Sequence, residues 1–91
     1  MADILRILEI KNIERKDVPI YYRRFYTGFL ILELFKKQEE RQIEFMIEIK
    51  PTGHKEISIT LNEAIDYPLV PLMNAIKQYI HDLDSEGGLP V

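Results

Sequence analysis

The sequence predicts an α+β domain: an antiparallel sheet of three to four strands in a meander, with one C-terminal amphipathic helix packed on one face. Three observations indicate this fold. Apolar side chains alternate with polar ones over residues 42–50 and again over 56–62, which is typical of strands with one buried face. Residues 28–35 form an apolar run of strand length. Over residues 69–83, apolar side chains recur every three or four positions, as on one side of a helix.

The N-terminal residues fit either a strand or a short helix. Four isoleucines between Ile4 and Ile13 favour a strand, because β-branched side chains lose rotamer freedom in a helix. Residues 12–19 are then a charged connection, and residues 20–26 either extend the next strand or pair as a separate one. Gly28 is expected to mark a bulge or bend.

The run 28–35 has apolar side chains on both of its strand faces. Its three leucines point to one face, whereas its two phenylalanines and its isoleucine point to the other. One helix covers one face, so the second face needs a partner chain, the N-terminal residues or a ligand. We predict an interaction surface there that is made of Phe29, Ile31, Phe35 and, from the adjacent strand, Met46.

The connections between the later elements follow from charge and from turn residues. Residues 36–41 are a charged run and are predicted to form a hairpin loop. In residues 51–54, Pro51 restricts one backbone angle and Gly53 permits a positive φ, which predicts a second hairpin turn. Three consecutive strands therefore form the meander.

Helix ends are predicted from prolines, an aspartate and glycines. Pro68 and Pro71 fall in the first turn, where proline removes no helical hydrogen bond, and Asp66 is expected to cap that end. Gly87 ends the helix, and residues 86–91 are expected to form a loose tail. The predicted core consists of Leu30, Leu32, Leu34, Ile43, Phe45, Ile47, Ile49, Ile57, Ile59, Leu61, Leu72, Ile76, Ile80 and Leu83.

Size and composition limit the class of protein. The 91 residues suffice for a single domain over 1–91. The chain has no cysteine, which excludes disulfides and thiolate chemistry and fits a cytoplasmic location. No signal peptide or membrane-length apolar stretch is present, so no membrane association is expected. A net charge of −3 disfavours tight binding to nucleic acid.

Residues 21–26, YYRRFY, alternate aromatic rings with arginines. Such rings stack on unpaired bases while guanidinium groups hold phosphates. In the favoured alternative, the rings pack on the sheet and the arginines stack locally, because the chain as a whole is acidic. The candidate nucleic-acid contacts are Tyr22, Arg23, Arg24 and Tyr26.

Catalytic and metal motifs do not emerge from the sequence. His54 and His81 lack further ligands at metal-site spacing. Glu44 and Glu48 fall on a wet strand face, and neither Ser58 nor Ser85 fits a catalytic triad. The glycines form no phosphate-binding loop. We expect no enzymatic activity, no metal and no cofactor.

These observations favour a small non-enzymatic interaction protein, a homodimer that associates through a sheet face or edge. One alternative is a single-stranded nucleic-acid-binding module. Another is a small ligand-binding protein or enzyme with a pocket between sheet and helix. The order of elements, strands followed by one long C-terminal helix, resembles the half-units of PUR-type and Whirly-type single-strand nucleic-acid binders, which work as paired copies. Their motif residues do not occur here, so no site residue is transferred.

Overall fold

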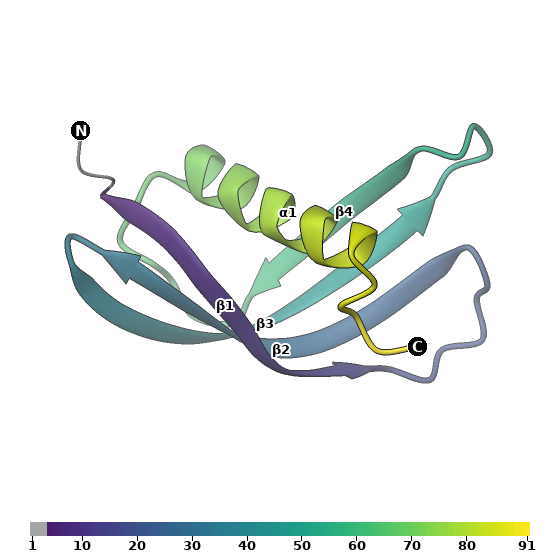
Figure 1. Ribbon diagram of the computed structural model, residues 1–91, viewed down its shortest axis with the longest axis horizontal. Coiled ribbons are helices and arrows are strands. Elements are labelled where there is room, and N and C mark those ends of the chain that lie inside the picture. The colour runs from purple at the N-terminus through teal and green to yellow at the C-terminus, as the bar shows by residue number, and fades with distance from the viewer. Residues whose placement is uncertain (1–3) are drawn as a thin grey trace.

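The computed structural model describes residues 4–91 as one four-stranded antiparallel sheet and one helix (Figure 1). The strands are neighbours in chain order, β1-β2-β3-β4, and α1 follows them. The α+β meander with a C-terminal helix is therefore confirmed, and the N-terminal isoleucines lie in a strand. The elements are β1 (Leu5–Arg15), β2 (Arg23–Leu34), β3 (Lys37–Ile49), β4 (Lys55–Leu61) and α1 (Leu69–Ser85).

The helix lies along the concave face of the twisted sheet, between the two outer strands β1 and β4 (Figure 1). Its stripe of Leu72, Ile76 and Ile80 is almost fully buried. The three leucines of β2 face this stripe and are buried with it, as the alternation in the sequence predicts. The core consists of Ile10, Tyr26, Leu30, Leu32, Leu34, Ile43, Phe45, Ile47, Ile57, Ile65, Leu72, Ile76, Ile80 and Leu89.

The ends of the core differ from the expectation. Ile49, at the end of β3, is 38% exposed because the helix does not reach it, whereas Ile65 in the connection before α1 is buried. The C-terminal residues do not form the expected loose tail in full. Leu89 packs into the core, and the backbone N–H of Gly88 donates to Leu83 O at 2.8 Å. An apolar side chain shortly after a helix end supplies enough buried surface to hold the chain in place.

The connection between β2 and β3 is much shorter than predicted. Residues 37–41 belong to β3 and pair with β2, so the charged hairpin loop predicted over 36–41 is wrong. Only Phe35 and Lys36 form the turn, and both have positive φ, 50° and 67°. Strand pairing uses backbone groups, and long charged side chains stay in water on the outer strand face, so charge alone did not end the strand.

The irregularity expected at Gly28 lies in the neighbouring strand. The β2–β3 register runs through Gly28 without a break. The β1–β2 register shifts twice, between Ile7 and Glu9 and between Lys11 and Glu14, and Asn12 has a φ of 51°. β1 thus carries two bulges and continues to residue 15, beyond the expected start of the connection at 12.

The helix begins without a side-chain cap. Pro68 occupies the N-cap position and makes no capping hydrogen bond through its side chain, so the prediction that Asp66 caps the helix is wrong. Asp66 lies two residues before the N-cap, outside the position from which a carboxylate reaches the first free N–H groups. Pro71 lies in the first turn as predicted, and the N–H of Leu72 donates to Pro68 O at 3.2 Å.

Candidate interaction surfaces

The sheet face away from the helix carries most of the predicted interaction surface. Phe29 and Ile31 lie on this face, where they oppose Gln42 and Glu40 of β3. Ile31 is only 4% exposed, although it does not belong to the core beneath the helix. Lys11 of β1 and Glu40 of β3 form an ion pair of 3.6 Å that crosses β2 between Phe29 and Ile31. Long polar side chains of the same chain therefore cover part of this face.

The two remaining residues of that prediction lie apart from each other. Met46 is half-buried on the same face and opposes Phe25 and Ser58. Phe35 sits in the β2–β3 turn and is 64% exposed. The structure thus brings Phe29 and Ile31 together and places Phe35 at one end of the sheet.

The Tyr/Arg segment is divided between the two faces of β2. Tyr26 has no exposed surface, and its ring stacks on Phe45 with the centroids 5.0 Å apart. Arg24 donates to the Tyr26 hydroxyl at 3.0 Å and to Asp84 Oδ1 at 3.1 Å. Both residues therefore belong to the junction between the sheet and the end of α1.

Asp84 is the centre of a charged cluster at that junction. It accepts hydrogen bonds from Arg24 and from Lys55 Nζ, the latter at 2.7 Å, and its side chain is 11% exposed. Burial opposes ionisation of this carboxyl, but the hydrogen bonds from Lys55 and Arg24 outweigh burial and lower its pKa. The cluster ties β2, β4 and α1 together.

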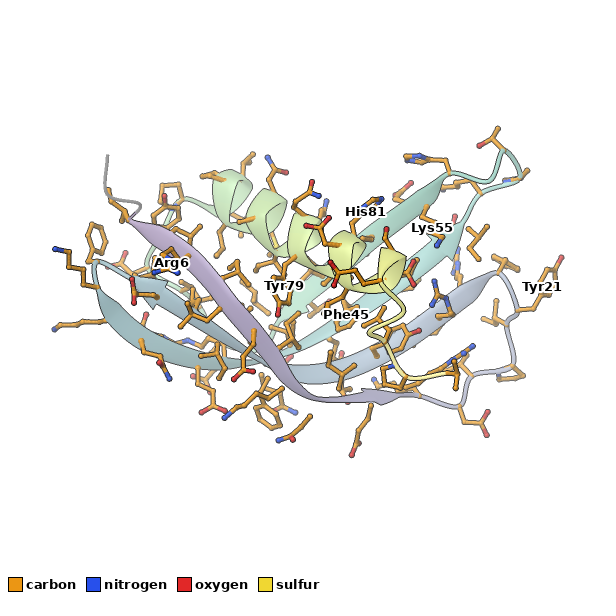
Figure 2. The ribbon with its side chains drawn as sticks, in the orientation of Figure 1. Arg6, Tyr21, Phe45, Lys55, Tyr79 and His81 are labelled. Carbon is orange, nitrogen blue, oxygen red and sulfur yellow. The ribbon has the colours of Figure 1, made fainter. Side chains whose placement is uncertain are left out.

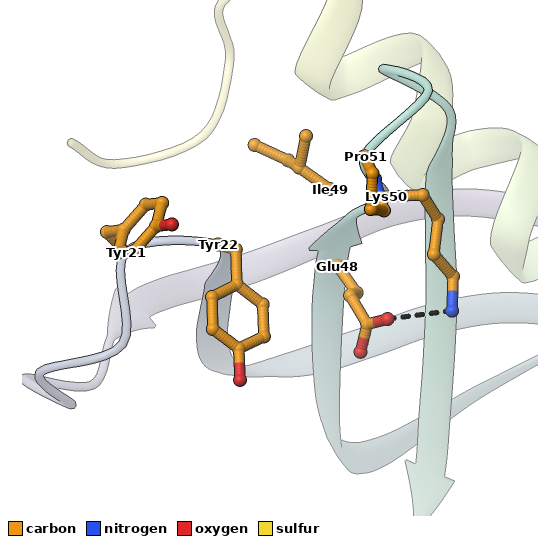
Figure 3. Close-up of a pocket in the computed structure, with 6 residues that line it drawn as sticks. All are labelled: Tyr21, Tyr22, Glu48, Ile49, Lys50 and Pro51. Atoms are coloured by element: carbon orange, nitrogen blue, oxygen red, sulfur yellow. Dashed lines mark ion pairs between the residues drawn. The ribbon is translucent and has the colours of Figure 1, made fainter.

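The exposed part of the Tyr/Arg segment lines a pocket at the opposite end from Phe35. Tyr21 and Tyr22 precede β2, and their rings meet edge to face with centroids 5.5 Å apart (Figure 3). Tyr21 is 92% exposed and projects from the end of the molecule (Figure 2). The pocket has a volume of about 500 Å³ and is lined by Tyr21, Tyr22, Glu48, Ile49, Lys50 and Pro51.

Ion pairs neutralise the charges around this pocket. Glu48 accepts from Arg23 Nε at 2.8 Å and pairs with Lys50 Nζ at 2.7 Å, and Lys50 also pairs with Glu56. The hydrogen bond with Lys50 lowers the pKa of Glu48, and the same bond raises the pKa of Lys50. The pocket offers aromatic and aliphatic surface, and the two charged side chains that line it are paired.

Sequence reasoning selected Tyr22 and Arg23 of this region but missed Tyr21, Ile49 and Pro51. The alternation of isoleucines along β3 predicts Ile49 in the core. The missing signal was length: β3 outlasts the helix above it, so its last apolar residue has no cover. The adjacent turn residue Pro51 then completes an apolar wall.

The outer edge of β4 is open along its length. In residues 4–91 no strand pairs with β4 on the side away from β3. Lys50 N donates to His54 O at 2.8 Å and Asn62 N to Gln42 O at 3.3 Å. Because hydrogen-bonded pairs alternate in an antiparallel ladder, these two bonds direct the backbone groups of Ile57, Ile59 and Leu61 away from β3.

Two hollows follow each other between this edge and α1. The first, about 550 Å³, is mainly apolar, with Ile59, Leu61 and Ala64 on one side and Leu69 and Met73 on the other. The second, about 410 Å³, is rich in basic and imidazole side chains and is lined by His54, Lys55, Glu56, Ile57, Asn74, Lys77, Gln78 and His81. Lys55 and His81 lie across from each other at this end of α1 (Figure 2). The open edge therefore has an apolar half and a basic half.

The described residues give no metal centre, since no three His, Asp or Glu side chains gather in 4–91 as metal ligands would. Within the same range α1 is too short and too polar to cross a membrane. The fold and surfaces define a small sheet-and-helix domain with exposed apolar surfaces at an aromatic pocket and an open strand edge. The chain belongs to the BB_0187 family, whose model matches residues 2–85. No curated protein and no solved structure matches it.

Proposed function

We propose that the protein is a non-enzymatic interaction module that pairs with a second copy of itself through the edge of its sheet. The observation that supports this proposal is the open edge of β4, whose outward backbone groups meet no strand in residues 4–91. Unpaired strand edges are templates for pairing with another chain. The absence of cysteine supports a cytoplasmic site of action.

The other surfaces offer less to a second copy. β1, the opposite edge, is interrupted by two bulges, which twist an edge away from further pairing. On the sheet face away from α1, Ile31 is already covered and Phe29 is half-buried. The β3–β4 register, in contrast, runs from Ile49 to Ile43 without a shift, so β4 presents a regular edge.

Sedimentation velocity of the full chain at increasing concentration tests self-association. We expect the mass to rise from 10.8 kDa toward twice that value within the micromolar range. A mass of 10.8 kDa at every concentration would contradict the proposal. The measurement should be repeated in high salt, because strand pairing and apolar burial persist when ionic contacts are screened.

The aromatic pocket favours a second candidate function, binding of single-stranded nucleic acid. Tyr21 and Tyr22 present exposed rings, and Arg23 lies over the Tyr22 ring at 5.5 Å. Bases stack on such rings. The ion pair between Arg23 and Glu48 and the net charge of −3 oppose a polyanion, so this candidate ranks second.

Titration of a labelled mixed-sequence oligonucleotide at two salt concentrations tests the second candidate. Binding that weakens with salt and is lost in Tyr21→Ala would support it. No binding at low salt would remove it. Phe35→Ala is the matched control, because it deletes an exposed ring at the other end of the sheet.

A further inference from the structure

We propose that the two copies join their β4 strands antiparallel, with the two-fold axis at Ile59, so that Lys55 of each copy faces Glu63 of the other. This inference rests on the proposed self-association and adds its surface and its register. The occupant of the open edge is thus a second copy of the same chain.

The backbone of β4 suits this register. The outward groups belong to the odd-numbered residues 57, 59 and 61, as the hydrogen bonds to β3 determine. With the axis at Ile59, each odd residue faces another odd residue, and Ile57 faces Leu61 of the second copy. Every outward N–H and C=O between 57 and 61 then has a partner, and the two sheets become one.

The side chains continue the two faces of the sheet across the junction. Ile57, Ile59 and Leu61 pack on the helix side of the sheet. In the proposed register they lie next to the same three residues of the second copy and extend the apolar row. Ser58 and Thr60 are exposed on the opposite face, where they face each other across the junction.

Charge complementarity favours a second copy over an unrelated peptide. A strand that runs antiparallel to β4 passes first along the apolar hollow and then along the basic one, where Lys55, Lys77 and His81 lie. The edge therefore suits a segment with alternating apolar residues followed by acidic ones. Residues 57–66 of this chain, ISITLNEAID, have that composition, with Glu63 and Asp66 both exposed.

Disulfide trapping tests the register directly, because the natural chain has no cysteine. Residues 58 and 60 form a non-hydrogen-bonded pair in the proposed register, where Cα atoms lie about 4.5 Å apart. That distance suits a disulfide, whereas residue 58 and its own copy are diagonal neighbours at about 7–8 Å, beyond disulfide reach. Ser58→Cys and Thr60→Cys change exposed residues and leave the core intact.

The two single-cysteine proteins are oxidised separately and as an equal mixture, with Ser85→Cys as an exposed control away from the edge. We expect the mixed disulfide to form in the mixture, and each variant alone to react no faster than Ser85→Cys. Faster trapping of Ser58→Cys alone would overturn this register. Absence of trapping above the control, in a protein that sedimentation shows to be dimeric, would overturn the edge pairing but leave self-association intact. A monomer in sedimentation would overturn both.

Discussion

Gly28 of β2 leaves the space that Ile10 of β1 fills. A Cβ atom at residue 28 would lie 2.8 Å from Ile10 Cγ2, closer than carbon atoms pack, and 3.4 Å from Lys11 O. The glycine lets β1 approach β2 between the two bulges of β1. Ile10 thereby reaches the core, where it is 8% exposed.

Gly28→Ala is expected to destabilise the protein by about 1–3 kcal/mol, because the added methyl group overpacks this contact. Urea unfolding followed by far-UV circular dichroism measures the loss. The same substitution should cost less in an Ile10→Ala background, where the clashing methyl group is absent. Equal costs in both backgrounds would show that Ile10 is not the residue that excludes the side chain.

Asp84→Asn is expected to lower stability at neutral pH by about 2 kcal/mol, because Arg24 and Lys55 lose a charged hydrogen-bond acceptor. A carboxyl whose pKa is lowered by folding stabilises the folded state above its ordinary value of 3.8, and this contribution is lost as pH falls through the lowered value. The wild type should therefore lose more stability than Asp84→Asn on acidification below about pH 4.

Unfolding curves from neutral to acidic pH test this expectation. Asp82→Asn is the matched control, since its side chain is 59% exposed and its ion-pair distance to His81 is 3.8 Å. The control should change stability by less than about 0.5 kcal/mol. Identical acid dependence of the wild type and Asp84→Asn would contradict the role given to the cluster.

Replacement of Phe35-Lys36 by Asn-Gly is expected to raise stability by about 1–2 kcal/mol, because both residues of this two-residue turn have positive φ. Ordinary side chains resist that conformation, whereas Asn and Gly adopt it readily. Thermal unfolding measures the gain. Since the turn lies away from β4, self-association should stay unchanged, and a loss of the dimer would return the predicted surface around Phe35 to consideration.

Glu63→Lys is expected to weaken self-association about 5- to 30-fold, because by symmetry it places like charges at two sites beside Lys55 in each dimer. Sedimentation equilibrium measures the change. Glu14→Lys alters the net charge equally but lies in β1, at the other edge, and should have little effect. Equal weakening by both variants would indicate a general effect of charge instead of a contact at the β4 edge.

Periodicity was sufficient to predict the sheet, the helix and the face of each strand that meets the helix. The leucines of β2 and the isoleucines of β3 and β4 have strict period two, and Leu72, Ile76 and Ile80 have the helical period. These patterns arise from burial, which acts on every residue of an element. They therefore survive in a single sequence.

Local geometry and long-range cover were harder to predict. The turn at Phe35-Lys36 lacks the residues that usually adopt positive φ, so a charged run nearby was the stronger, misleading signal. Burial of Ile31 depends on Lys11 and Glu40, which are far apart in sequence and meet across β2. The open edge of β4 depends on strand order, which the strand patterns do not contain.

The two outer strands of the sheet differ in regularity, and this difference limits how many chains one assembly can hold. When two β4 strands are joined, the strand left at each end is β1, with its shifted register and the left-handed backbone of Asn12. A third chain finds no straight ladder on which to continue. Growth into a filament stops at two subunits, so the module can expose one bare strand without the hazard of open-ended polymerisation.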